Sequence, residues 1–268
     1  MKKILTLVIT VGLIITSFGQ EAADKTILAG LTIGGALNFN DSRTESMEAK
    51  VGGDFMAGML LDWNFSNNVG LTTGLEFEFD NFKTSYKIDG QPAVYYAYDD
   101  KEILRYKDDI SSNAGHFLLE DRKHSNIYVT LPVMLKFQTN FLGYFRYFGR
   151  FGVRNSFGLM TRTTDTGFEV NPAGNPIEQS ASTKEKMSSK GLMNFYRGSI
   201  GITGGAEYNI TGSTTLVAEL GYFYGFTQMY RKGENARSLY HINSDNSYDY
   251  YASKLKQGLL MLKVSVLF

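Results

Sequence analysis

Apolar and polar residues alternate along most of the chain after residue 26. A period of two is typical of β-strands with one apolar face, because successive side chains of a strand point to opposite sides. Ile127 and Val129, for example, alternate with Tyr128 and Thr130. Each alternating segment is longer than the usual globular strand of about five or six residues. Eight strands are predicted in this way, at 27–39, 54–65, 69–79, 127–137, 144–157, 196–208, 215–226 and 257–268.

The links between these segments alternate between short and long. Tight links at 66–68, 138–140 and 209–212 follow the second, fourth and sixth segments, and long links follow the others. An even number of antiparallel strands with short periplasmic turns and long external loops is the pattern of outer-membrane barrels. A soluble sandwich or lipocalin-like barrel, with its apolar face inward, is the alternative. We therefore expect an all-β fold, an eight-stranded antiparallel transmembrane β-barrel over 27–268, with both termini in the periplasm of a Gram-negative bacterium.

Large aromatic residues fall at the ends of the predicted strands. Trp63 and Phe137 would lie at the periplasmic rim, and Phe55, Phe79 and Phe226 at the outer rim. Aromatic side chains collect at both interfaces of a membrane, so two belts are expected for a barrel that spans one. A soluble sandwich gives no reason for this sorting, and the aromatic pattern therefore favours the membrane barrel.

The N-terminus has the pattern of a secretory signal. Lys2 and Lys3 precede an apolar stretch, and Ser17 and Gly19 place small residues before a predicted cleavage at Gln20. The apolar stretch is too short to span a membrane as a helix. We expect a signal peptide at 1–19, a periplasmic segment at 20–26, and export of the mature chain to the outer membrane.

Composition excludes several classes of function. The 268 residues hold 27 Lys and Arg against 27 Asp and Glu, so there is no basic surplus to drive nucleic-acid binding. The absence of cysteine excludes disulfides, thiolate metal sites and a cysteine nucleophile. No motif for a metal or a cofactor is present, and neither is expected.

The polar faces of the predicted strands carry balanced charges that would point into the barrel. A barrel of about eight strands has an interior just wide enough for side chains, so buried charges there must pair. An anion ladder through an open pore is the alternative interpretation. Pairing predicts low or no conductance. The predicted lumen network comprises Asp54, Asp62, Glu76, Glu78, Lys136, Arg146, Arg150, Arg154, Arg197, Glu207, Glu219 and Lys263.

The second and fourth external loops are rich in tyrosine. Tyrosine offers a large amphipathic contact area at a low cost in conformational entropy, which suits binding loops. These rings could instead pack on one another or extend the strands. A protein partner in an outer-membrane complex or a surface glycan is the expected ligand, in addition to membrane lipid. The candidate binding residues are Tyr95, Tyr96, Tyr98, Tyr106, Tyr240, Tyr248, Tyr250 and Tyr251.

Evidence for catalysis is weak, and no enzymatic activity is expected. His124 and Ser125, near the acidic Glu120 and Asp121, could form a hydrolase site only if the fold brought them into the required geometry. A surface lipid hydrolase is therefore the least favoured alternative.

Three segments resemble the PorT-like outer-membrane β-barrel family of Bacteroidetes. They are 131–137 (LPVMLKF), 201–208 (GITGGAEY) and 221–227 (GYFYGFT). Pro132 lies in mid-strand, and we expect a bulge there because proline cannot donate to the ladder. The resemblance implies an outer-membrane barrel, and one branch of the family serves type IX secretion and gliding. The long loops suit a surface-binding or accessory role better, with a narrow solute channel as the alternative.

Overall fold

The computed structural model describes residues 27–106, 114–189, 191–211 and 214–268. The predicted signal peptide, 1–19, and the segment 20–26 lie outside the described residues. Within the described part, thirteen strands form one hydrogen-bonded sheet. The strands are β1 (Ile27–Ser42), β2 (Glu48–Asn64), β3 (Val69–Ser85), β4 (Tyr95–Asp99), β5 (Glu102–Ile103), β6 (Gly115–Gln138), β7 (Phe145–Val170), β8 (Ser182–Ser188), β9 (Tyr196–Thr211), β10 (Thr214–Gly225), β11 (Leu239–Ile242), β12 (Tyr248–Tyr251) and β13 (Leu255–Leu267).

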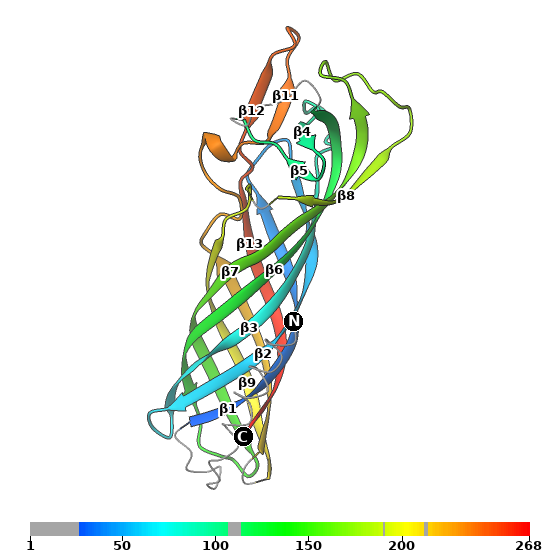
Figure 1. Cartoon of the computed structure of the whole chain (residues 1–268). Helices are drawn as coiled ribbons and strands as arrows, with labels where there is room; N and C mark the ends of the chain where they lie inside the picture. Colours follow the sequence, from blue (N-terminus) through cyan, green and yellow to red (C-terminus); the bar gives the residue numbers. More distant parts are fainter. Residues whose placement is uncertain (1–26, 107–113, 190, 212–213) are drawn as a thin grey trace.

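Eight of these strands pair in a closed cycle. From β1 the neighbours run β2, β3, β6, β7, β9, β10 and β13, and β13 pairs again with β1. Every pairing in the cycle is antiparallel, and Figure 1 shows its strands as the tilted wall of an elongated barrel. Closure gives every strand of the cycle two partners, which satisfies the backbone without an open edge.

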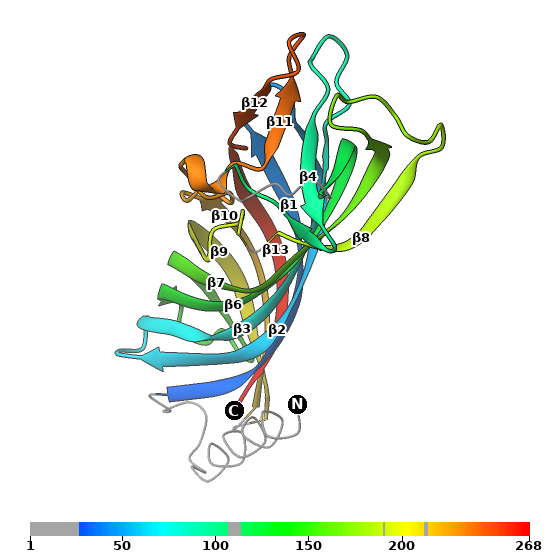
Figure 2. The same cartoon turned by 45° about the horizontal axis from the view of Figure 1, so that its top comes forward.

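The predicted count of eight strands is wrong for the sheet as a whole. β4, β5, β8, β11 and β12 form within segments that the alternation pattern left as loops. They extend the sheet beyond one end of the cycle, as Figure 2 shows. We call the cap these five strands, the long links at this end of the barrel, and the parts of β2, β3, β6 and β7 on the same side of Phe55, Phe79, Ile127 and Met160. Its short strands have two to seven residues, too few for an alternating pattern to stand out from a loop.

The barrel wall is apolar outside and charged inside. Leu31, Ile202 and Leu262 expose about three fifths of their surface, whereas the side chains of Glu78 and Lys136 are fully buried. Water-facing strands would bury the first set and expose the second. The wall therefore has the polarity of a barrel surrounded by lipid, as the sequence predicted.

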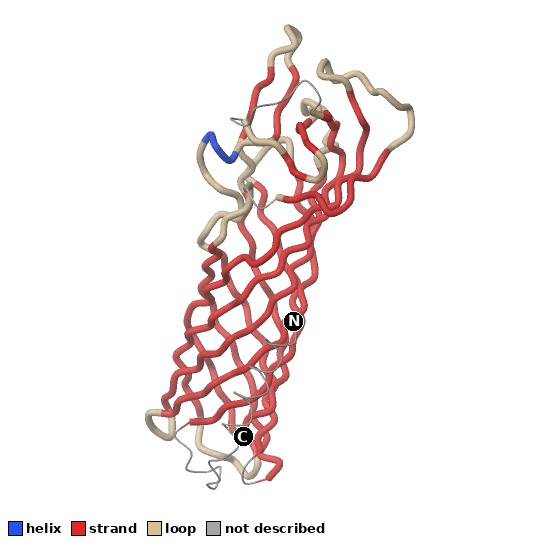
Figure 3. The backbone as a smooth tube through the Cα atoms, in the orientation of Figure 1, coloured by secondary structure: helices blue, strands red, loops and turns tan. Residues whose placement is uncertain are grey.

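The end of the barrel opposite the cap is made of short turns. The turn from β2 to β3 is closed by the Phe65 amide, which donates to Val69 O at 2.9 Å. The chain ends here too, where the Phe268 amide donates to Ala29 O at 2.8 Å. Figure 3 shows compact loops at this end and longer ones at the cap.

Apolar packing is concentrated in the cap. Its buried cluster joins side chains from distant segments of the chain, among them Met47, Phe82, Phe117, Met187 and Tyr230. Two smaller clusters lie among the lumen charges, one around Met56 and Phe223 and one around Leu60 and Phe148. The cap is thus a folded extension with its own core, and not a set of independent loops.

Candidate functional site

The lumen near the short-turn end contains an ionic cluster of five buried residues, to which the less buried Arg146 is joined through Glu207. Lys136 Nζ lies 2.7 Å from Asp62 Oδ2 and also bonds the carboxylate of Glu207. Arg150 Nη1 lies 2.5 Å from Glu219 Oε2, and its Nη2 lies 3.1 Å from Asp62 Oδ2. All five residues are at most 5% exposed. Each charge therefore has an opposite charge in contact, which offsets the cost of burial.

A second cluster occupies the lumen closer to the cap. Arg154 reaches Glu76 Oε2 and Glu78 Oε2, both at 3.0 Å. Lys263 bonds Glu76, and Arg197 bonds Glu78. These ion pairs join β3 to β7, β9 and β13, none of which is next to β3 in the cycle, so they tie separate parts of the wall together across the lumen.

Little free volume remains between the two clusters. The cavity lined by Glu76, Arg150, Arg154 and Glu219 measures about 10 Å³. A cavity of that size holds about one water molecule. At this level the described lumen is therefore filled by side chains.

Eleven of the twelve residues predicted for the lumen network form ion pairs, and Arg146 does so with Glu207. Asp54 does not: its Oδ1 accepts from Asn38 Nδ2 at 2.6 Å, and its Oδ2 has no partner within the described residues. Sequence reasoning missed Asp80, because the third predicted strand ended at Phe79. Asp80 is fully buried and bonds Asn38, so the lumen carries one acidic group more than the balanced set predicted.

The base of the cap contains a buried ion pair that the sequence did not indicate. Arg122 Nε and Nη2 each lie 2.8 Å from one carboxylate oxygen of Asp165. The Tyr96 ring lies under the guanidinium, 5.2 Å from its centroid to Arg122 Cζ. Burial and the nearby Asp165 raise the pKa of the Tyr96 hydroxyl well above its ordinary value. The period of two across 121–126 could have located Arg122 on the inward face.

Five tyrosines form a connected cluster on the cap, which we call the tyrosine patch. Tyr240 is at the centre, with ring centroids 4.6 Å from Tyr248, 5.0 Å from Tyr250 and 6.0 Å from Tyr95. Tyr106 lies against Tyr250 at 4.9 Å. Tyr240 is fully buried, whereas Tyr106 is 47% exposed and the other three are half-buried. Burial raises the pKa of Tyr250 to about 12, so its hydroxyl stays protonated at neutral pH.

The cap fixes the centre of this patch by a polar contact from a neighbouring strand. His116 Nδ1 lies 2.6 Å from the Tyr240 hydroxyl. Burial lowers the pKa of His116, which keeps its ring neutral near pH 7. The Tyr248 hydroxyl donates to Pro172 O at 2.8 Å. β4, β6, β11 and β12 thus hold the patch in one arrangement.

The other predicted tyrosines lie elsewhere. Tyr96 in the cap core and Tyr240 in the tyrosine patch are both fully buried, so neither ring has surface that a partner could contact. The prediction that these two residues contact a partner is therefore corrected. Tyr98 donates to Glu169 Oε2 at 2.9 Å, and Tyr251 is stacked on His241. Sequence alone could not separate these roles, because each depends on which segments pack together.

The structure does not form the proposed hydrolase site. His124 is fully buried, stacked on Phe82 at 4.2 Å, and its Nε2 lies 3.1 Å from the Tyr230 hydroxyl. Ser125 points to the opposite side of β6, where it donates to Asn81. Adjacent residues of a strand face opposite sides, so this histidine cannot activate this serine.

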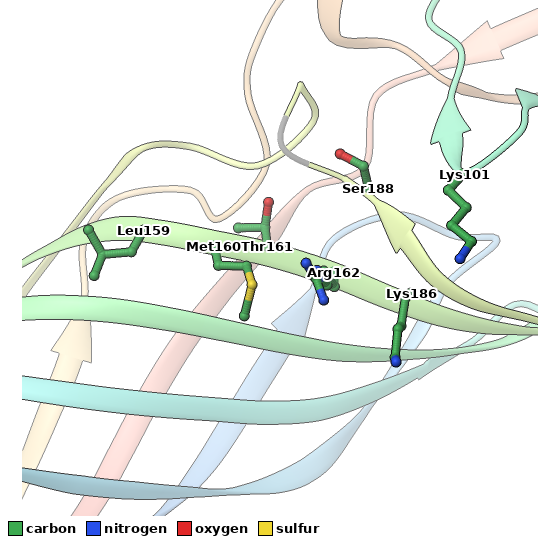
Figure 4. Close-up of a pocket in the computed structure, with 7 residues that line it drawn as sticks. All are labelled: Lys101, Leu159, Met160, Thr161, Arg162, Lys186 and Ser188. Atoms are coloured by element: carbon green, nitrogen blue, oxygen red, sulfur yellow. The ribbon is translucent and has the colours of Figure 1, made fainter. Parts of the chain in front are cut away.

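A basic pocket lies where the cap meets the apolar wall. It has a volume of about 400 Å³ and includes Lys101, Arg162 and Lys186 from three different segments. Leu159 also lines the pocket and is 56% exposed on the outer wall. Figure 4 shows it on the side of the pocket away from Lys101 and Lys186. Sequence reasoning missed this site, since the three cations are far apart along the chain.

In the described part of the chain, no helix is long and apolar enough to cross a membrane. No group of three or more His, Asp and Glu side chains there could hold a metal ion.

An apolar outer wall, a charged and filled interior and strands closed in a cycle define an integral β-barrel of the outer membrane. The chain belongs to the outer membrane protein beta-barrel domain family, whose model matches residues 18–231. The protein is accordingly an outer-membrane protein.

Solved structures of outer-membrane proteins are similar to the chain. OprG from Pseudomonas aeruginosa is 10% identical over 92% of this chain and 97% of its own, with a TM-score of 0.45. A major outer membrane protein from Thermus thermophilus is 14% identical over 90% and 99%, with a TM-score of 0.37. Neisserial surface protein A is 11% identical over 91% and 98%, with a TM-score of 0.35. No curated protein sequence matches the chain.

Proposed function

We propose that this protein is a non-enzymatic surface-binding or accessory barrel, which uses its cap to bind a macromolecule outside the cell. The observation that carries the proposal is the tyrosine patch, in which a buried Tyr240 fixes four accessible rings. Rings that are already immobilised lose little conformational entropy on binding, and this favours affinity. The filled lumen supports an anchoring role for the barrel in preference to a narrow solute channel.

The proposed orientation places both chain ends in the periplasm and the cap outside. The short turns and Phe268 are at one end of the barrel, and every long connection is at the other. Outer-membrane barrels place their short turns in the periplasm. The tyrosine patch would then face the cell exterior.

The partner classes that we propose are a protein of an outer-membrane complex or a surface glycan. Tyrosine faces and hydroxyls contact either class well, because the rings are apolar and their edges donate hydrogen bonds. Membership in the PorT-like branch, with an accessory role in type IX secretion or gliding, is the narrower form of this proposal. It rests on the three sequence segments at 131–137, 201–208 and 221–227.

The test uses point variants, because deletion within 81–125 would remove β4 and part of the cap core. The double variant Tyr106→Ala, Tyr250→Ala removes two accessible rings of the patch. We expect it to lose a stoichiometric partner that co-purifies with the native protein in mild detergent, or to lose glycan binding if no protein co-purifies. Tyr144→Ala is the control, since Tyr144 is 68% exposed near the opposite end. Equal recovery of the partner or glycan with the double variant would contradict the proposal.

A further inference from the structure

The lipid-facing wall on the β2, β3, β6 and β7 side ends at a defined row. Strand register places Phe55 beside Phe79, Phe79 beside Ile127, and Ile127 beside Met160. Phe55 and Phe79 are 53% and 39% exposed. Leu159 is the extra residue of a bulge at this level and is exposed as well. Beyond this row, the described cap parts of these four strands have one exposed large apolar residue, Val51, so the row marks the edge of the continuous apolar band.

Cations follow directly beyond that row. Lys50 lies beside Lys83, and Lys83 beside Lys123, so three lysines stand next to one another across β2, β3 and β6. Arg162 is opposite Ser125, between the apolar row and the lysine row. With the two lysines of the pocket, these exposed cations form what we call the basic belt: Lys50, Lys83, Lys101, Lys123, Arg162 and Lys186.

The belt is not neutralised by the protein itself. Among the described residues, none of its six cations takes part in an ion pair. For the three neighbouring lysines, the nearest outward carboxylates by register are Glu48 and Asp121, which lie one row further from the membrane, on either side of Ser85. At the pocket, exposed Asp100 and Glu102 flank Lys101, and exposed Glu185 precedes Lys186, without forming an ion pair with either lysine. Like charges placed directly opposite one another in a sheet repel. A bound anion would remove that repulsion.

The height of the belt selects the kind of anion. Two residues along a strand advance about 7 Å, or about 5 Å along the membrane normal for a strand tilted by about 40°. The belt therefore lies roughly 5 to 10 Å beyond the hydrocarbon edge, within the headgroup layer of a bilayer. Lipid phosphates lie in that layer.

The basic pocket supplies a concave site at one end of the belt. Arg162 and Lys186 project from neighbouring strands, and Lys101 comes from the link between β4 and β5 (Figure 4). The Ser188 amide donates to Lys101 O at 2.7 Å, which fixes that link against β8. Leu159, which lies on β7 on the barrel side of Arg162, offers an apolar surface to an acyl chain. A headgroup with a phosphate and a chain beneath it matches this combination.

We propose that the basic belt and its pocket bind the phosphate-bearing headgroup of an anionic lipid in the leaflet on the cap side, which is the outer leaflet in the orientation proposed above. Arg162 supplies a planar guanidinium, which can donate two hydrogen bonds to one phosphate, and the lysines supply point charges. The site is independent of the tyrosine patch and of any partner that binds there.

Native mass spectrometry of the purified protein in non-ionic detergent tests the proposal. The probes are phosphatidic acid, which carries a phosphate monoester, phosphatidylcholine with the same acyl chains, and inorganic phosphate. We expect phosphatidic acid to bind in preference to phosphatidylcholine. The double variant Lys123→Gln, Arg162→Gln should bind phosphatidic acid about thirtyfold more weakly, because two surface cations are lost. The double variant Lys232→Gln, Lys254→Gln removes two exposed cations outside the belt and should leave phosphatidic acid binding unchanged.

Three outcomes would overturn the assignment. Equal binding of the two lipids would show that charge is not recognised. Undiminished binding of phosphatidic acid by the Lys123, Arg162 variant would place the site elsewhere. Competition by millimolar inorganic phosphate that fully displaces the lipid would identify a site for free phosphate and not for a lipid. None of these results bears on partner binding at the tyrosine patch, so the two proposals fail separately.

Discussion

Arg122 and Asp165 show how a single pair can hold the cap on the barrel. The two-point contact at 2.8 Å is almost inaccessible to water, and both residues lie on neighbouring strands that continue from the barrel into the cap. Removing one partner of such a buried pair costs about 3 to 5 kcal/mol, because the other charge is left uncompensated. The Lys87–Glu120 pair on the cap surface is exposed on the lysine side and contributes little by comparison.

His124, beside this pair, makes the cap sensitive to acid. Burial and the charge of Arg122 hold the pKa of His124 well below its ordinary value, so the folded cap keeps the ring neutral. The unfolded state binds a proton below a pH of about 6.5, and cap stability therefore falls with decreasing pH by up to about 1.4 kcal/mol per unit. Hydrogen exchange of β4 and β6 amides at pH 7 and pH 5 measures the effect. His124→Gln should reduce this slope, and the histidine-dependent part that remains belongs to His116, whose pKa burial also lowers.

The matched control for this prediction is His241→Gln, because His241 stacks on Tyr251 nearer the cap surface. This variant should retain the pH dependence of the native protein. An unchanged slope in His124→Gln would show that another group of the cap carries the acid sensitivity.

The seam between β1 and β13 is the element on which closure of the barrel depends most directly. A Cβ atom at Gly30 would lie 1.8 Å from the backbone oxygen of Val266, so no other residue fits there without moving β13. Overpacking of this kind costs about 1 to 3 kcal/mol. We expect Gly30→Ala to lower the temperature at which the folded barrel band disappears in a heat-modifiability gel.

Gly35→Ala provides the comparison on the same strand. The atom nearest to a Cβ at Gly35 would be the backbone oxygen of Asp54, at 3.6 Å. That variant should unfold at the temperature of the native protein. Equal effects of both substitutions would indicate that β1 responds to lost glycine flexibility and not to the close approach at Val266.

Strands were predictable where the alternation was long, and details within them were not. Pro132 does not lie at a bulge: Thr73 pairs with Val133 and Glu76 with Thr130, so the register is the same on both sides. The ladder with β3 skips Pro132, whereas on the β7 side Pro132 stays paired with Arg154. On the β3 side the Thr73 hydroxyl donates to Pro132 O at 2.8 Å. A side chain from the neighbouring strand compensates for the missing contacts, which sequence alone could not show.

At the scale of the whole molecule, the lumen ion pairs act against transport. Between the two clusters they leave a cavity of about 10 Å³. The cap extends the sheet beyond the end toward which the long strands run (Figure 2). We expect no conductance steps from the purified protein in planar bilayers. Replacing Arg150 and Arg154 by alanine removes the two largest lumen side chains of this region and should introduce steps. Steps from the native protein would contradict the closed lumen.

The sequence by itself determined the class of the protein. A period of two over long segments sets which face of each strand is apolar, and alternating link lengths set which end carries the long connections. Both signals are local, so the apolar wall and most lumen charges followed from the order of residues. Asp80 was missed because the alternation fades at the rim, where the wall changes from lipid to water.

Only the tertiary structure decided what the long links do. The tyrosine patch, the Arg122–Asp165 pair and the basic belt each join residues from separate segments, and nothing in the spacing along the chain specifies those contacts. The cap folds because its segments bury a common core, which is a cooperative property of several links together. Tyr96 and Tyr106 lie ten residues apart in one tyrosine-rich stretch, yet packing buries the first completely and leaves the second exposed.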